Sequence, residues 1–441
     1  MKAAQQEVKH CVKEAKDSYR RKVEQKLREN NMREVWEGVR TITGLNTKTR
    51  AVGGTMERAN ELNDFFNSLL RPQVQHAQDR LQFAYQPGVG VEDAILYLLH
   101  RAHSHLDKGS GTVRILFLDF SSAFNTIQPS LLRGQTEQDG SGPPADGLDL
   151  RTYLTGRPQY AGLKDITSDT VVSSTGAPQG TVLAPLLFTL YTSDFFYNSE
   201  LCHIQKYADD TAIVGCIRDD REEEYRRLVG DFAAWCHTNH LQLNTSKTKE
   251  LVIDFGRSRP RPRPVLLEGA EVEAVDSYRY LGLWLDNKLD WTTHTSHLYG
   301  KTQRQDVLPK ETAVLQHLQQ TSCRCFTSLW LPVSSFTLWC AGGAAYPKKD
   351  TSRLDKLIRR AGSVVGMKLD SLVMVAESRT LDKLLDIMDN ASHPLHTVIS
   401  NQRSLFSERL LLPKCRTNRL KNSFVHHAIT LYNSSQGGRR T

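Results

Sequence analysis

The chain has 441 residues, with shares of hydrophobic (39%) and charged (24%) side chains that are ordinary for a soluble globular protein of two or three domains. Its net charge of +8 favours polyanionic partners, and eight irregularly spaced cysteines are typical of free thiols in a reducing compartment rather than of a disulfide framework. The polar N-terminal stretch does not resemble a signal peptide, and no run of about 18 apolar residues is present to span a membrane. We therefore expect a protein of the nucleus or cytoplasm that does not bind membranes.

The first 70 residues are expected to be helical and basic. Apolar residues recur at three- and four-residue steps over 1–43, and Gly44 would end this helix. A second helix is expected over 56–70, with Pro72 after it. Up to Arg58 the chain holds 14 Lys and Arg against 8 Asp and Glu, which indicates either an arm that faces nucleic acid or an ordinary solvated helix face.

Apolar strands and amphipathic helices follow one another through the middle of the chain. Helices are expected over 91–106, 181–196 and 222–241, strands over 113–120 and 249–255, and hairpins over 203–215 and 272–286. Residues 134–149 carry Gly, Pro and charge without apolar periodicity, so a loop or a disordered insert is expected there. This order of elements favours a mixed α/β domain over a regularly alternating one.

Three carboxylates stand at the ends of these strands. Asp209 and Asp210 lie side by side at the tip of the 203–215 hairpin, and Asp119 ends the apolar strand 113–120. Adjacent acidic side chains repel each other and resist burial, so a solvent-exposed turn is the plain explanation for the pair. Bound divalent cations would instead favour adjacent carboxylates, because carboxylate oxygens are good ligands for such ions. Three converging carboxylates could hold two metal ions about 3.5–4 Å apart, which is the arrangement used for nucleotidyl transfer.

Five sequence blocks occur in a fixed order along the chain: LFLDFSSAFNTI, GAPQGTVLAPLLFTLY, KYADDTAIV, LQLNTSKTKELVIDF and YRYLGLWLD. Together they resemble the palm motifs of reverse transcriptases from non-long-terminal-repeat (LINE-type) retrotransposons. The similarity covers residues 81–132 and 151–300. It implies an RNA-directed DNA polymerase that uses two Mg²⁺ ions, with Mn²⁺ as the alternative, and that binds an RNA template, a DNA primer and deoxynucleoside triphosphates.

The resemblance assigns catalytic roles to four residues. Asp119, Asp209 and Asp210 match the carboxylates that bind the metal ions in this family. Lys247, in the segment NTSKT, matches a lysine that protonates or shields the pyrophosphate. Without the resemblance, Lys247 would be interpreted as a surface lysine.

A second set of residues matches positions that contact the incoming nucleotide. Phe124 matches an aromatic residue under the sugar, whose ring would clash with a 2′-hydroxyl and so select deoxynucleotides; core packing is its plain interpretation. Gln179 matches a residue that contacts the nucleotide, and Gly180 lets the backbone approach it. Tyr207 is expected beneath the Asp209–Asp210 pair.

The expected fold is an α/β (α+β) right-hand polymerase palm, in which a small antiparallel sheet is backed by the helices near 91–106, 181–196 and 222–241. The fingers are expected to be truncated. The expected domains are a basic helical region (1–70), the palm core (71–264), a primer-grip-like hairpin (265–300), a divergent thumb segment (301–347) and a helical C-terminal region (348–441).

The chain also departs from the family pattern. It leaves no room before residue 81 for a fingers segment with cations that clamp the triphosphate, and 134–150 and 303–346 replace expected helices. The resemblance therefore describes a partial and degraded copy, for which a shifted reading frame is a hypothesis. The alternatives to a working polymerase are an inactive remnant that retains only nucleic-acid binding and a relic without function.

Overall fold

A computed structural model describes residues 79–109, 111–132, 154–160, 162–163, 166–177, 181, 183–219, 221–256, 262–305, 352–356, 358–359, 370–404, 406–407 and 409–437. These residues belong to one of two compact units of the chain, the unit that spans 65–308 and 321–441. The predictions for 1–70, for 134–150 and for nearly all of 303–346 lie outside the described residues.

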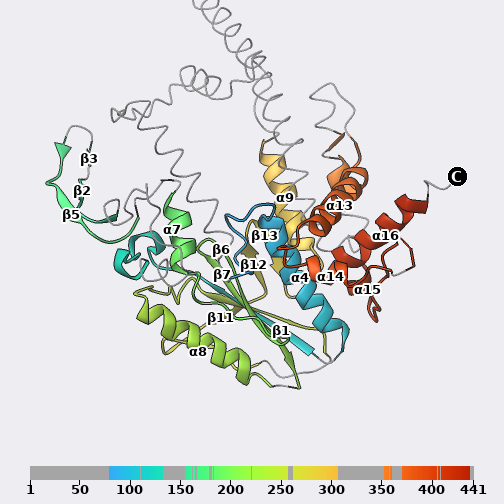
Figure 1. Cartoon of the computed structure of the whole chain (residues 1–441), viewed down its shortest axis with the longest axis horizontal. Coiled ribbons are helices and arrows are strands. Elements are labelled where there is room, and N and C mark those ends of the chain that lie inside the picture. The colour runs from blue at the N-terminus through green and yellow to red at the C-terminus, as the bar shows by residue number, and fades with distance from the viewer. Residues whose placement is uncertain are drawn as a thin grey trace, which may run out of the picture. The chain divides into compact units, whose positions relative to one another are not determined.

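A five-stranded sheet forms the centre of this unit (Figure 1). Its strands lie in the order β11 (Glu273–Val275), β8 (Lys249–Asp254), β1 (Gly111–Leu118), β7 (Asp210–Arg218) and β6 (Cys202–Tyr207). Neighbouring strands from β6 to β8 are antiparallel, whereas β11 runs parallel to β8. The expectation of a purely antiparallel sheet is therefore wrong at this edge, because the chain returns through the ribbon of β9 (Leu266–Leu267) and β10 (Ala270–Glu271) before it pairs with β8.

Strand β1 shows why an uninterrupted apolar run becomes a central strand. Side chains alternate between the two faces of a strand. Leu116 and Leu118 share a core with α7 (Leu183–Tyr191) and α8 (Glu223–Thr238), while Val113, Ile115 and Phe117 share another with α4 (Val91–Asp107). The three expected helices are thus confirmed as the covers of the sheet, although α7 ends at Tyr191 rather than near residue 196.

A buried ion-pair network fixes one face of the sheet. The Arg114 guanidinium is fully buried and binds both carboxylate oxygens of Glu250 at 2.9 and 2.8 Å, and its third nitrogen lies 2.7 Å from Glu222. The Tyr225 hydroxyl donates to Glu250 over 2.7 Å. Burial alone would lower the pKa of Arg114. The hydrogen bonds and the charge of Glu250 outweigh that effect and raise the pKa above its usual value, so the guanidinium stays charged. The network ties β1 to β8 and α8.

The remaining elements are short strands and helices: η1 (Ala123–Asn125), β2 (Arg157–Gln159), β3 (Gly162–Leu163), β4 (Ile166–Thr167), β5 (Val171–Ser173), β12 (Ser277–Tyr280), β13 (Leu283–Asp286) and α9 (Thr292–Gln305). Strands β12 and β13 form the hairpin expected over 272–286, but it begins at Ser277 because the preceding residues join the sheet as β11.

Helices α13 (Leu372–Asp389), α14 (His396–Ser400), α15 (Asn418–Lys421) and α16 (Phe424–Gly437) complete the unit. Helices α13, α14 and α16 share an apolar core with α4. The fully buried Asp93 carboxylate near the start of α4 lies 3.0 Å from His393 and 3.2 Å from Lys383. None of the helices in the described part of the chain is long and apolar enough to cross a membrane.

Candidate active site

The turn between β6 and β7 carries the adjacent carboxylates. Tyr207 pairs with Asp210 at the end of the ladder, and both Asp209 and Asp210 are exposed. Ala208 has a φ of 55°, a left-handed conformation that is strained for a residue with a side chain. Its amide donates to the Gln82 side-chain oxygen over 3.2 Å, which holds the strained residue in place.

Asp119 comes next to this turn because of the register between β1 and β7. Leu118 pairs with Thr211, so the residue that follows β1 lies beside Asp210 on the neighbouring strand. The Asp119 backbone is fixed on both sides: its amide donates to the Thr248 hydroxyl over 3.4 Å, and its carbonyl accepts from the Asn244 amide over 2.8 Å. The structure thus brings together the three carboxylates that the sequence indicated.

The three carboxylates interact electrostatically with one another. Although Asp210 is exposed as a residue, its carboxyl group is partly shielded from water; this desolvation, followed by the charges of Asp209 and Asp119, raises its pKa to about 6. The pKa of Tyr278 on β12 is raised by burial, with further contributions from Asp210 and Asp119. The site therefore has a negative potential that a cation would relieve.

The donor set suits a divalent metal ion in its chemistry. Carboxylate oxygens are the ligands that Mg²⁺ prefers, and the buried Oδ2 of Asp119 makes no hydrogen bond within the described residues. However, no group of three or more His, Cys, Asp or Glu side chains in the described part of the chain is already arranged to hold a metal ion. The Lys247 ammonium lies 3.7 Å from Asp119 Oδ2 and is largely exposed.

Phe124 lies on η1 and packs edge-on against Phe188 of α7, with ring centroids 5.8 Å apart and an interplanar angle of 75°. The ring is half-buried, so part of it faces solvent. The chain before the Pro-Gln-Gly segment docks on η1: the Ala177 amide donates to the Phe124 carbonyl over 2.7 Å. Gln179 and Gly180 lie outside the described residues.

The β12–β13 hairpin packs on the α4 side of the sheet, next to the carboxylates. Tyr278 stacks on Phe117 of β1, with ring centroids 4.2 Å apart and an interplanar angle of 8°. The Tyr280 hydroxyl accepts a hydrogen bond from Gln205 of β6 over 3.0 Å. These contacts place the proposed primer-grip segment beside the strands that carry the acidic residues.

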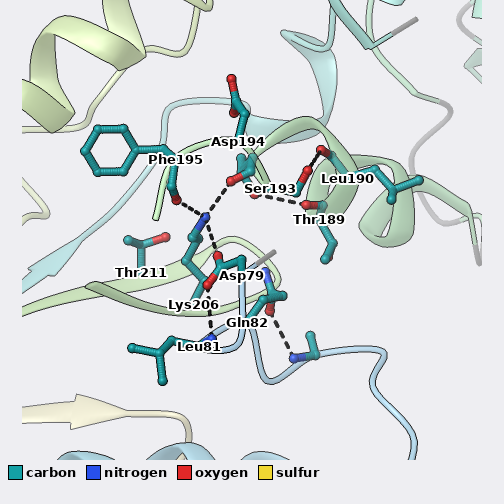
Figure 2. Close-up of polar contacts among 12 residues, drawn as sticks. Asp79, Leu81, Gln82, Thr189, Leu190, Ser193, Asp194, Phe195, Lys206 and Thr211 are labelled. Atoms are coloured by element: carbon teal, nitrogen blue, oxygen red, sulfur yellow. Dashed lines mark hydrogen bonds and ion pairs between the residues drawn. The ribbon is translucent and has the colours of Figure 1, made fainter. Parts of the chain in front are cut away.

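A buried cation was missed by the sequence reasoning. Lys206, directly before the turn, is only 2% exposed, and Figure 2 shows its ammonium surrounded by oxygen atoms. It lies 2.7 Å from Asp79 Oδ2 and donates to the carbonyls of Phe195, over 2.6 Å, and Thr192. Thr192 directly follows α7, so Lys206 ties the strand that leads into the turn to the C-terminal end of this helix.

The segment around Asp79 also supports the turn. The Lys206 amide donates to the Leu81 carbonyl over 2.9 Å, and the Lys206 carbonyl accepts from the Phe83 amide over 2.8 Å. Between them, Gln82 reaches Ala208. A signal for Lys206 was present in the sequence, because a period of two places it on the same face as the apolar Ile204.

Comparisons with known proteins point to one family. The family model for reverse transcriptase (RNA-dependent DNA polymerase) matches residues 41–285. In Drosophila melanogaster, the probable RNA-directed DNA polymerase from transposon BS is 25% identical over 75% of this chain and 36% of its own length. The probable RNA-directed DNA polymerase from transposon X-element of the same species is 28% identical over 42% of this chain and 20% of its own length. The RNA-directed DNA polymerase from its mobile element jockey is 24% identical over 56% of this chain and 27% of its own length.

The chain thus spans about a third or less of the curated relatives that it matches. Among solved structures, a telomerase from Candida tropicalis in complex with a TWJ fragment of telomeric RNA aligns over 86% of this chain and 54% of its own, with a TM-score of 0.43 and 11% identity.

Proposed function

This chain belongs to the reverse transcriptase (RNA-dependent DNA polymerase) family, and on that premise we propose that Asp119, Asp209 and Asp210 perform two-metal nucleotidyl transfer on an RNA template. The retrotransposon relatives support an RNA template, a DNA primer and deoxynucleoside triphosphates as its ligands. The observation that carries the proposal is the convergence of three carboxylates at the ends of two neighbouring strands, where desolvation and then the charges of Asp209 and Asp119 raise the pKa of Asp210.

In the proposed mechanism, the three carboxylates would hold two Mg²⁺ or Mn²⁺ ions. Bound ions of this kind activate the attacking primer hydroxyl and neutralise charge on the leaving pyrophosphate. Lys247, whose ammonium lies 3.7 Å from Asp119 Oδ2, would protonate or shield the leaving pyrophosphate. The exposed part of the Phe124 ring supports the sugar and excludes a 2′-hydroxyl, and Gln179, Gly180 and Tyr207 complete the nucleotide site.

The test is primer extension on an RNA template with Mg²⁺ or Mn²⁺, comparing the wild-type chain with an Asp209→Asn, Asp210→Asn variant. A matched control removes two other exposed carboxylates, Asp231→Asn and Glu268→Gln. We expect extension by the wild type and the control, and none by the turn variant. The absence of extension by folded wild-type protein would refute the proposal; if that protein still binds RNA, the chain is the inactive remnant with nucleic-acid binding only.

A further inference from the structure

A cavity of about 730 Å³ lies at the end of the sheet opposite to the carboxylates. It is lined by the end of α4 (Asp107, Lys108 and Gly109), the end of β7 (Arg218 and Asp219) and the segment Lys414–Arg416 before α15. Arg218 pairs with Gly111 at one end of the β1–β7 ladder, and Thr211 pairs with Leu118 at the other. Seven residue steps along a strand separate the two ends by roughly 23 Å, so the cavity is a separate site.

The lining of this cavity contains four cationic and two acidic side chains. Lys108, Arg218, Lys414 and Arg416 are all exposed. Among the described residues, none forms an ion pair with Lys108, Arg218 or Lys414. The stretch Arg409–Lys421 contains five basic residues and no acidic residue. The cations outnumber the carboxylates, and this excess of positive charge favours an anionic ligand.

The two acidic residues of the lining have other partners. The buried Asp107 carboxylate accepts hydrogen bonds from the Arg416 amide at 3.0 and 2.9 Å, and from the Thr417 amide and hydroxyl at 2.6 and 2.7 Å. These bonds also hold the segment Lys414–Arg416 against the end of α4, so the cavity is built by specific contacts. Asp219 lies 3.7 Å from Arg221 in an exposed pair.

A neighbouring histidine, His105, interacts with the positive charges that line the cavity. His105 is buried, and its Nε2 lies 2.8 Å from the Ile217 carbonyl oxygen. Its pKa is lowered mainly by burial; the hydrogen bond with the Ile217 carbonyl acts in the opposite direction, and the charges of Arg218, Lys108 and Arg101 lower the pKa further.

We propose that this cavity binds the sugar–phosphate backbone of a single-stranded nucleic acid, at a second site apart from the catalytic carboxylates. The lining offers several cations for phosphate groups. It contains no aromatic side chain on which a base could stack, so the ligand would be held by contacts to its phosphate groups, which carry no sequence preference. The choice of nucleic acid over other polyanions rests on the proposed function.

The test measures binding alone, so it does not depend on polymerase activity. A fluorescent single-stranded RNA oligonucleotide is titrated with the full chain in EDTA over a series of salt concentrations. The test variant is Arg218→Gln, Lys414→Gln. The matched control removes two exposed cations elsewhere, Arg227→Gln and Lys356→Gln.

We expect the slope of log affinity against log salt to fall by about 1.4 in the test variant, because each lost phosphate contact on a single strand changes it by about 0.7. The affinity at moderate salt should fall roughly tenfold, and the control should keep the wild-type slope. Equal slopes in the two variants would overturn the proposal. So would complete displacement of the RNA by inorganic triphosphate at the same phosphate concentration, which would indicate a small-anion site.

Cys415 gives a local readout, because it lines the cavity and is half-buried. Its rate of alkylation by N-ethylmaleimide, followed by peptide mass spectrometry, should fall several-fold when RNA saturates the wild-type chain. An unchanged rate would show that the RNA binds elsewhere. If RNA protects Cys415 but primers are not extended, the second site stands and the polymerase proposal fails.

Discussion

Substitution of Lys206 by methionine tests whether a buried charge holds the catalytic turn. Methionine has nearly the same length as lysine but no charge and no donor. The substitution leaves the Asp79 carboxylate, 2% exposed, without its partner at 2.7 Å, and it leaves the Phe195 and Thr192 carbonyls without their donor. Asp79 keeps one hydrogen bond, because its Oδ1 accepts from the Leu81 amide over 3.0 Å.

The magnitude follows from the burial of both partners. Removal of one member of a buried ion pair typically costs about 3–5 kcal/mol, because the remaining charge stays buried without compensation. We expect Lys206→Met to lower the free energy of unfolding by about 4 kcal/mol. The double variant Asp79→Asn, Lys206→Met removes both charges, so its loss should be smaller than the sum of the single losses by about 2 kcal/mol.

Urea unfolding followed by tryptophan fluorescence measures these differences. Lys356→Met is the matched control, because Lys356 is exposed, and it should change the stability by less than about 0.5 kcal/mol. Amide hydrogen exchange at residues 207–211 should also accelerate in Lys206→Met relative to the distant strand β11. Additive losses in the double variant, or a Lys206→Met chain as stable as the control, would refute the reasoning.

Three further predictions follow from individual contacts. Gly176→Ala should lower the free energy of unfolding by about 2 kcal/mol or more in chemical unfolding, because Gly176 has a φ of 72° and a Cβ there would lie 2.7 Å from the Asn125 Cα. The control Gly230→Ala in α8, where a Cβ would meet no atom within 4 Å, should leave the stability unchanged or raise it. Phe124→Val should raise kcat/KM for ribonucleotides relative to deoxynucleotides roughly tenfold in primer extension, and an unchanged ratio would remove Phe124 from the sugar site. Burial alone would raise the pKa of Asp93, but His393 and Lys383 lower it below 3.8, so its ionised form adds stability that is lost as the pH falls through the folded-state pKa. In thermal melts between pH 2.5 and 6, the melting temperature of Asp93→Asn should therefore fall less steeply on acidification than that of the wild type.

The strands and helices of the sheet could be predicted because their signals are local. The apolar run of β1 and the 3.6-residue periodicity of α4 and α8 are properties of short segments. The parallel edge strand β11 could not be predicted in the same way, because its direction depends on a crossover through β9 and β10. The early end of α7 could not be predicted either, because the carbonyl of Thr192, directly after the helix, accepts a hydrogen bond from Lys206 on strand β6.

The same division holds for the candidate site. Asp119, Asp209 and Asp210 could be found because each lies at or next to the end of an apolar strand, and the register of β1 against β7 then brings them together. Asp79 and Gln82 could not be found, because nothing in their local sequence indicates that they support a turn more than 120 residues away. Their role appears only when the 79–84 segment lies along β6.

These supports explain how the sheet tolerates adjacent carboxylates at one tip. Repulsion between Asp209 and Asp210 tends to open the turn, and Ala208 adds backbone strain. The Gln82 side chain holds the strained residue, and Lys206 anchors the preceding strand to α7 and Asp79. Arg114 fixes β1, and hence the position of Asp119, through Glu250 on β8. Buried cations outside the site therefore hold the mutually repelling carboxylates in a fixed geometry. Divalent ions bind most favourably to carboxylates that are already held in place in this way.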